Sequence, residues 1–325
     1  MAGGINVLFD KRKIALTRAR LSAWWEGANF DKEAALAAIE AKFAAINENQ
    51  ITGADDALSD ELPFEPPPRL AALEIMWGVG RIRPGDAATE ALAPACVGIA
   101  PEGVLAVLGA GHIAPLRAFA GAHPGKIDVF EWRDETLEAM KYGMRKAALG
   151  ERVSAARIDL EAHVFTPGAY DGLISIDDFA YCGYPPHLAQ QIMKCLKPGA
   201  AALIEAYVGF RAAEMATAFA SSFAEPQIRP HGDILQFFVD AGLQLEADED
   251  VTEEFMGFAR SGFKELSGRL ADAQLDVGCA RELAWEAEAW RMRLKLLAQR
   301  RLERRRFLVR KPTEPQSANT NTPAG

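Results

Sequence analysis

The chain has 325 residues, a formal net charge of −9 and 49% hydrophobic residues, which is ordinary for a globular protein of one large domain or of a core domain with a helical cap. The negative charge argues against general nucleic-acid binding, and no apolar run approaches the roughly 18 residues that a membrane span requires. The N-terminus lacks a long apolar segment and the four cysteines form no C-x-x-C pair, so we expect a cytoplasmic protein with neither a secretory signal nor a zinc site.

Residues 1–65 predict a helical extension that ends in a linker. Apolar residues recur at helical spacing over 11–26 and again over 32–46, where Asp31 is the candidate N-cap. The segment 47–68 is acidic and contains three consecutive prolines, which cannot continue a helix. The extension could close over the site of the later domain or form a contact in a homo- or hetero-oligomer, and the sequence does not choose between these roles.

The remaining chain divides into a core domain over 66–311 and a polar tail over 312–325 that we expect to be disordered. The core domain opens with a short helix over 69–76 and the loop WGVGRIRPGD, whose last residue, Asp86, is a candidate N-cap. Trp77, at the start of this loop, is expected either to anchor the core or to contact a ligand.

The stretch that follows indicates a nucleotide-binding β-α-β unit. A buried apolar run, Val104 to Leu108, leads into the glycine turn Gly109-Ala110-Gly111, and a helix and a second strand come after it. A helix that begins at such a turn presents free backbone N–H groups to a ligand. The second strand ends at Glu131, 22 residues after Gly109, close to the spacing of roughly 20 at which doubly wound folds place the carboxylate that binds a ribose. The alternative for Glu131 is a solvent-exposed charge at a strand end.

Helices and strands continue to alternate, which predicts a mainly parallel α/β sheet with right-handed crossovers. The expected elements are a helix over 134–148, strands over 153–158 and 172–176, a helix over 186–196 and a strand over 200–208. They continue with a helix, a glycine stop and a strand over 231–251, a long helical stretch over 252–297 broken near Gly268 and Gly278, and a last strand over 306–310.

Over 70–311, the order and spacing of these pieces resemble class I S-adenosylmethionine-dependent methyltransferases. The matching segments are VLAVLGAG, IDVFE, ARIDL, YDGLISIDD, LKPGAAALI and FFVDAGLQLEADEDVT. The upstream WGVGRIRPGD also resembles the W-G-x-G-x-x-x-P-G segment of small-molecule methyltransferases that act on amines and related acceptors. The resemblance implies a Rossmann-like, seven-stranded, mostly parallel sheet with a late reversed hairpin. It also implies S-adenosylmethionine as cofactor and a small-molecule acceptor, with an amine favoured over a hydroxyl.

By this resemblance, the cofactor-binding positions are Gly109, Gly111, Glu131, Trp132, Asp159 and Asp177. The two glycines would line the methionine end, the glutamate would accept hydrogen bonds from both ribose hydroxyls, and the tryptophan would flank the adenine. The first aspartate would accept from the adenine amino group, and the second would lie where the acceptor meets the sulfonium. The sequence departs from the family motif at Val107, where an acid is usual, and at Ile113, which replaces a third glycine.

The catalytic candidates are Asp178 and Tyr181, which follow the fourth predicted strand. Methyl transfer is an in-line displacement that depends on proximity and orientation, so a carboxylate that removes a proton from the acceptor is sufficient chemistry. The alternatives are that the aspartate caps its turn and that the tyrosine packs in the core. Asp159 has the same alternative, because aspartates at strand ends often cap the following turn.

His112 lies inside the glycine turn, where it could contact an anionic ligand group or be a helix-start residue that faces solvent. None of the five histidines has metal-ligand spacing.

Ten cationic residues lie between Arg291 and Lys311, opposed only by Glu303, and Trp285 and Trp290 in the preceding helix are expected to pack. We expect the cations to form a solvated helix face that runs into an edge strand, with RNA or an anionic lipid surface as the less favoured partner.

The leading functional hypothesis, which follows from the family resemblance, is methyl transfer to a small molecule. The second hypothesis is a non-catalytic methyltransferase-like protein that has lost the cofactor and acts as a binding or partner subunit.

Overall fold

The structure is a computed structural model that describes residues 31–37, 64–209, 226–273 and 275–313. At the start of the first range, Asp31 caps a helix over 32–37: its Oδ1 accepts hydrogen bonds from the backbone N–H groups of Glu33 and Ala34. This confirms the predicted cap. The predicted first helix, most of the linker and most of the tail lie outside the described residues.

One mixed sheet forms the centre of the described chain, with its strands in the order β3-β2-β1-β4-β5-β8-β7 and with β6 beside β5. The strands are β1 (Val104–Leu108), β2 (Lys126–Glu131), β3 (Val153–Arg157), β4 (Tyr170–Ile176), β5 (Leu196–Gly209), β6 (Arg229–Pro230), β7 (Gln244–Asp250) and β8 (Leu302–Arg310). Strands β1 to β6 pair in parallel, whereas β8 pairs antiparallel with both β5 and β7. The predicted α/β sheet with a late reversed hairpin is confirmed, and the two-residue β6 adds an eighth strand.

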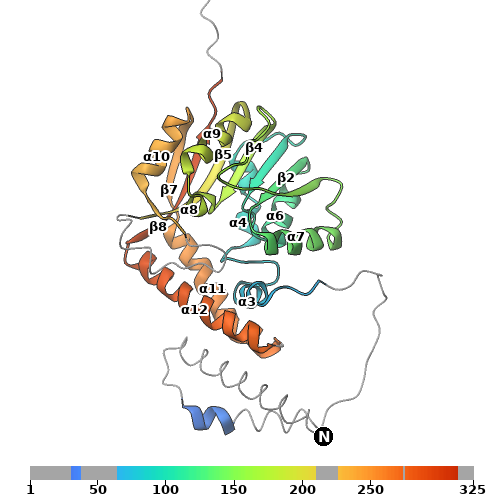
Figure 1. The fold of residues 1–325 in the computed structure, drawn as a ribbon, viewed down its shortest axis with the longest axis vertical. Coiled ribbons are helices and arrows are strands. Elements are labelled where there is room, and N and C mark those ends of the chain that lie inside the picture. Colours follow the sequence, from blue (N-terminus) through green and yellow to red (C-terminus); the bar gives the residue numbers. More distant parts are fainter. Residues whose placement is uncertain (1–30, 38–63, 210–225, 274, 314–325) are drawn as a thin grey trace, which may run out of the picture.

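Helices cover both faces of this sheet and its carboxyl edge (Figure 1). They are α3 (Pro68–Trp77), α4 (Ala87–Glu90), α5 (Ala93–Cys96), α6 (Ile113–Ala122), α7 (Asp134–Lys146), α8 (Asp178–Tyr181), α9 (Pro185–Cys195), α10 (His231–Asp240), α11 (Thr252–Asp272) and α12 (Val277–Ala298). Helices α9 and α10 pack on one face, and α5, α6 and α7 pack on the other. Helices α3, α11 and α12 share a third apolar cluster with α8, the end of β5 and the start of β8.

In the sheet, β2 and β3 lie on one side of β1, and β4 and β5 lie on the other, so the strand order reverses direction at β1. In open α/β sheets, ligands bind in the crevice outside the carboxyl ends of the strands at this switch point. The sequence order therefore brings three predicted features to one edge of the sheet: the glycine turn after β1, Glu131 at the end of β2, and the aspartates Asp177 and Asp178 after β4.

The tryptophans of the carboxyl-edge helices divide between core and surface. Trp77 is 5% exposed, and its ring centroid lies 5.0 Å from that of Phe263 and 4.6 Å from that of Trp290. Trp77 is therefore a core anchor. Trp285 is 53% exposed, so the expectation that it packs is wrong. Five residues along an α-helix turn a side chain by about 140°, which places Trp285 away from the buried face that Trp290 occupies.

Two predicted boundaries are wrong. Strand β8 lies between β5 and β7, so the arginine-rich C-terminal segment is not an edge strand. Helix α11 runs through Gly268, so the break predicted there is wrong, whereas the break predicted near Gly278 comes just before it: α12 begins at Val277, and Asp276 caps it by accepting the Cys279 N–H at 2.7 Å. A glycine inside a helix costs only about 1 kcal/mol relative to alanine, which is less than burial of neighbours such as Leu270 provides.

Candidate functional site

The glycine turn after β1 has a backbone that only glycine adopts without strain. Gly109 has φ +63° and Gly111 has φ +81°. A Cβ on Gly109 would lie 2.5 Å from both the carbonyl oxygen of Ile176 and Oδ1 of Asp178. A Cβ on Gly111 would lie 2.7 Å from Nη1 of Arg83. The turn is therefore in close contact with the end of β4 and with the loop that follows α3.

Arg83 holds this turn from the loop WGVGRIRPGD. It is 7% exposed, and its Nη1 and Nη2 donate to the carbonyl oxygens of Gly109 and Ala110, each at 3.1 Å. Burial lowers the pKa of the Arg83 guanidinium from its ordinary value. The same loop supplies the predicted cap Asp86, whose Oδ2 accepts the N–H of Thr89 at 2.9 Å. The sequence predicts a loop here but not its contact with the glycine turn.

Glu131 is fully buried at the end of β2, so it is not an exposed strand-end charge. Its Oε1 accepts from the backbone N–H groups of Trp132 and Arg133, both at 3.0 Å, and from Nε of Arg133 at 2.6 Å. Its Oε2 accepts from the Gly111 N–H at 3.1 Å and from Nη2 of Arg133 at 2.9 Å. The carboxylate thus links the end of β2 directly to the glycine turn.

Asp178 is a second fully buried carboxylate at this edge. Its Oδ2 accepts from the Ser175 hydroxyl at 2.8 Å, whereas Oδ1 has no hydrogen-bond partner among the described residues. Burial raises the pKa of Asp178 to about 7. The residue begins α8, and the Oδ1 atom lies against Gly109 and does not cap a turn.

Asp177 has a different environment from its neighbour. Its backbone is left-handed, with φ +72°, and its Oδ1 is ion-paired with Arg304 of β8. Nη2 of Arg304 also donates to Glu205 at 3.0 Å. Burial raises the pKa of the Asp177 carboxyl, but the charges of Arg304 and Arg83 outweigh it and hold that pKa below its usual range. Asp177 is therefore a fixed anion, whereas Asp178 is the carboxyl group that titrates near neutrality.

The other predicted residues lie around these two carboxylates. The ring centroids of Trp132 and Tyr181 are 5.2 Å apart, and the Arg133 guanidinium lies 4.6 Å from the centre of the Trp132 ring. Asp159 is exposed, and its Oδ1 accepts the Glu161 N–H at 2.9 Å, as expected for a turn cap. The structure thus brings Trp132 and Tyr181 together and leaves Asp159 on the surface.

His112 is buried and does not face solvent, in contrast to one of its two predicted roles. Its Nδ1 accepts the Ile113 N–H at 2.7 Å and caps α6, and its Nε2 lies 3.4 Å from Oε1 of Glu74. Burial lowers the pKa of His112 to about 4, so the ring is neutral at pH 7 and Nε2 carries the proton.

The two departures from the family motif are accommodated away from the turn. Val107 is fully buried in the apolar cluster between the sheet and α6. Ile113 packs between Gly80 and Gly143, because a Cβ on either glycine would lie 2.7 Å from the isoleucine side chain. Gly80 and Gly143 therefore provide the space that the branched side chain needs.

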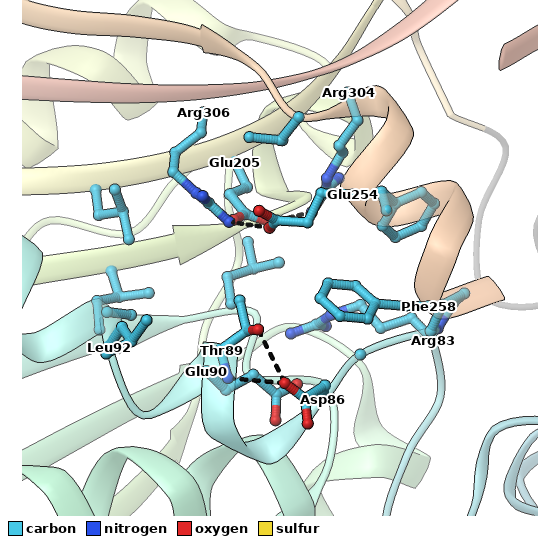
Figure 2. A pocket seen from close by; sticks show the side chains of 18 of the residues that line it. Arg83, Asp86, Thr89, Glu90, Leu92, Glu205, Glu254, Phe258, Arg304 and Arg306 are labelled. Atoms are coloured by element: carbon cyan, nitrogen blue, oxygen red, sulfur yellow. Dashed lines mark hydrogen bonds and ion pairs between the residues drawn. The ribbon is translucent and has the colours of Figure 1, made fainter. Parts of the chain in front are cut away.

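A cavity of about 230 Å³ adjoins the site, between α4, α5 and the start of α11 (Figure 2). Its apolar wall includes Leu92, Ile176, Leu203, Phe255 and Phe258. Its charged wall is an ion-pair chain in which Arg306 contacts Glu205 at 2.8 Å and Glu254 at 2.9 Å. Arg83 and Ser175, which hold the glycine turn and Asp178, also line the cavity, so it shares a wall with the carboxyl edge of the sheet.

The basic segment near the C-terminus is largely paired within the fold, and the prediction of a solvated face is wrong for Arg293 and Arg304, which are buried. Ion pairs with carboxylates include those of Arg291, Arg300, Arg304, Arg305, Arg306 and Arg310. Arg304 is 1% exposed, because the central position of β8 carries its side chain into the molecule.

Among the residues that the structure describes, no group of three or more His, Cys, Asp or Glu side chains is arranged to hold a metal ion. Within the same residues, no helix is long and apolar enough to cross a membrane.

Comparison with known proteins identifies the fold. No protein-family profile matches the sequence, and no curated protein matches it. Among solved structures, the cyclase SpnF is 16% identical with a TM-score of 0.58, over 77% of this chain and 98% of that chain. A protein of Galdieria sulphuraria that is named as a sarcosine dimethylglycine methyltransferase is 14% identical, with a TM-score of 0.63. The match covers 75% of this chain and 98% of that chain.

A phosphoethanolamine N-methyltransferase 2 from Haemonchus contortus, solved with S-adenosyl-L-methionine, is 20% identical with a TM-score of 0.64. The match covers 74% of this chain and 56% of that chain, so this chain spans little more than half of the Haemonchus protein. This chain has the class I methyltransferase fold. The resemblance drawn from the sequence is confirmed at the level of the fold.

Proposed function

We propose that this protein is an S-adenosylmethionine-dependent methyltransferase that acts on a small-molecule acceptor, with an amine nitrogen favoured over a hydroxyl. The observation that carries the proposal is the meeting of the glycine turn, Glu131 and Asp178 at the carboxyl edge of the sheet. The Haemonchus protein, which shares the fold, is named as a phosphoethanolamine N-methyltransferase and was solved with this cofactor.

The residues at this edge fit the chemistry of the cofactor. Gly109 and Gly111 give the turn its positive-φ backbone, and Glu131 is a carboxylate suited to two ribose hydroxyls. We assign the adenine contacts to Trp132 and Asp159, and the methionine end to the two glycines. Bound here, S-adenosylmethionine would supply an electrophilic methyl group on a sulfonium.

Two carboxylates of different charge state suit the transfer itself. Asp177, held ionised by the charge of Arg304, places a fixed negative charge beside the site. Asp178, with a pKa of about 7, is present in both protonation states at neutral pH, and its Oδ1 is free to accept a proton from an acceptor amine. Tyr181, which packs against Trp132, lines a small cavity together with Arg133 and Asp177. We assign catalysis to Asp178, with Tyr181 positioning the acceptor.

We place the acceptor in the cavity of about 230 Å³ beneath α4 and α11. Its apolar floor favours a hydrophobic body, and the wall that it shares with Arg83 and Ser175 brings an acceptor toward the glycine turn and Asp178. The small size of the cavity is suited to a small molecule and too small for a macromolecular segment.

The second candidate is a non-catalytic protein of this fold that has lost the cofactor. It is favoured by one observation: the hydrogen-bonding capacity of Glu131 is already used within the protein, in large part by Arg133. The cyclase SpnF carries the same fold under the name of a different reaction, so the fold alone does not decide between the candidates.

Titration calorimetry with S-adenosylmethionine and S-adenosylhomocysteine separates them. The enzyme proposal expects saturable heat, and it expects Glu131→Ala to weaken binding at least tenfold. Glu138→Ala, which removes an exposed carboxylate from α7, is the control and should leave the affinity unchanged. Absence of heat and of a thermal shift at millimolar ligand would refute the enzyme and leave the non-catalytic protein.

A further inference from the structure

Arg133 and Glu131 form a buried, bidentate ion pair inside the candidate cofactor site. Nε and Nη2 of the guanidinium donate to Oε1 and Oε2 at 2.6 and 2.9 Å, which is the parallel two-bond geometry of a strong arginine–carboxylate pair. The Arg133 side chain is 6% exposed and the Glu131 side chain is fully buried. The pair is therefore shielded from water and from salt.

The hydrogen-bonding capacity of Glu131 is full. A carboxylate offers about four lone-pair sites, and Glu131 accepts three backbone N–H groups and two guanidinium N–H groups. The three backbone donors belong to the β2–α7 connection and to the glycine turn, so they cannot leave without refolding those segments. The two guanidinium donors belong to a side chain, and they are the ones that a ligand can replace.

We propose that Arg133 is a built-in competitor for the ribose subsite: its guanidinium occupies the two acceptor positions of Glu131 that a nucleoside cis-diol would use, and the nucleoside binds by displacing it. A cis-diol and a guanidinium edge each present two parallel donors, so the exchange conserves the hydrogen bonds of the buried carboxylate. The proposal rests on the proposed function, because it takes the cofactor to be the nucleoside that binds here.

The energetics of the pair make displacement reasonable. A buried ion pair is weak evidence for stability, because the desolvation of both charges offsets their attraction. Removal of one partner alone is costly, since it leaves a buried charge without compensation. Arg133 therefore leaves only when another pair of donors arrives, so that Glu131 keeps its hydrogen bonds in both states. The neighbouring Trp132 ring, 4.6 Å from the guanidinium, provides a surface along which the side chain can move.

Competition by Arg133 lowers the affinity for the nucleoside below the value that the site would have without this side chain. Apparent affinity falls by the fraction of molecules that are competent to bind, and minor conformations in proteins are commonly populated at about 0.1–10%. Removal of the competitor should therefore tighten nucleoside binding by about tenfold or more. Loss of a merely structural arginine would weaken binding or leave it unchanged, so the direction of the effect is diagnostic.

The test is calorimetric titration of the full chain with S-adenosylhomocysteine, whose sulfur is uncharged, for the wild type, Arg133→Ala and Arg133→Lys. We expect Arg133→Ala to bind at least tenfold more tightly than the wild type, and Arg133→Lys, which keeps the charge without the two-donor edge, to fall between them. Arg157→Gln removes a nearby exposed arginine that pairs with Asp134, and it is the control. If Arg133→Ala does not fold, the lysine variant carries the comparison.

The outcomes separate this proposal from the proposed function. Binding by the wild type with no gain in either variant overturns the competitor and leaves the function intact. Binding by the variants alone shows that Arg133 excludes the ligand from the wild type, which overturns both the displacement and the proposed function. Absence of binding by all proteins at millimolar ligand overturns both proposals.

A second measurement reports on Arg133 directly. The Nε–H proton of a buried, ion-paired arginine exchanges slowly with water and gives a resolved signal in proton–nitrogen correlation spectra. Addition of S-adenosylhomocysteine should abolish or strongly shift this signal, assigned by its absence from Arg133→Lys. An unchanged signal at saturating ligand would overturn the displacement.

Discussion

Replacement of Asp178 by asparagine should change how the stability of this protein depends on pH. In the folded protein, burial raises the pKa of Asp178 to about 7 from its ordinary value of 3.8. Between these two values the unfolded chain releases a proton that the folded protein keeps, so the free energy of unfolding falls as pH rises. Asparagine has no such titration and retains an oxygen that can accept from Ser175.

The magnitude follows from the two pKa values. A shift of roughly three units corresponds to about 4 kcal/mol of stability lost between acid and neutral pH. Of this loss, about 2–3 kcal/mol falls between pH 5 and pH 8. The stability of Asp178→Asn relative to the wild type should therefore rise by this amount over that interval.

Urea unfolding at pH 5, 6, 7 and 8, followed by circular dichroism, measures the difference. Asp240→Asn removes an exposed carboxylate at the end of α10 and serves as the control. Parallel curves for the wild type and Asp178→Asn across the whole interval would refute the assignment of a buried, partly protonated carboxyl at the glycine turn.

Three further substitutions test other parts of the site. Arg304→Gln deprives the buried Asp177 of its ion-pair partner and removes one of the two arginines that pair with the partly buried Glu205. It should lower the free energy of unfolding by about 3–5 kcal/mol in urea titrations, and a loss below about 1 kcal/mol would contradict the network. Gly109→Ala forces a Cβ to within 2.5 Å of two oxygens, so it should lower the free energy of unfolding by about 1–3 kcal/mol and abolish binding of S-adenosylhomocysteine. Gly121→Ala, in open space on α6, is the comparison and should raise the free energy of unfolding by about 0.5–1 kcal/mol. Because the buried His112 imidazole has a pKa of about 4, the free energy of unfolding of the wild type should fall by up to about 3 kcal/mol as pH falls from 6.5 to 4. His112→Asn keeps an N-cap but removes this imidazole, so the free energy of unfolding of the variant should fall less over the same interval.

The sequence by itself was sufficient for the fold because its determinants are local. The apolar run from Val104 to Leu108 is a strand buried on both faces, and the glycines after it mark a turn with positive φ. The caps Asp31 and Asp86 were predictable for the same reason, since a cap bonds to N–H groups two or three residues away. Alternation of helices and strands then fixed a parallel sheet, and the sheet placed Glu131 beside the turn.

The partners of the site residues were decided only by the tertiary structure. Arg304 belongs to a basic segment that resembles a solvated surface, and it is buried because β8 inserts between β5 and β7 and meets Asp177, 127 residues earlier. No local pattern reports such a pairing. Trp285 and Trp290 have the same local context, and only the packing of α12 exposes one and buries the other.

The glycine turn shows both contributions. Its backbone, its position at the carboxyl edge and its distance along the chain from Glu131 follow from the sequence. The contacts of the site depend instead on side chains that meet in space. Arg133 pairs with that carboxylate, Arg83 donates hydrogen bonds to the turn, and one oxygen of Asp178 has no hydrogen-bond partner among the described residues. Periodicity and spacing determine which face of an element is buried, but the charge state and hydrogen-bond partners of a buried group depend on every segment packed around it.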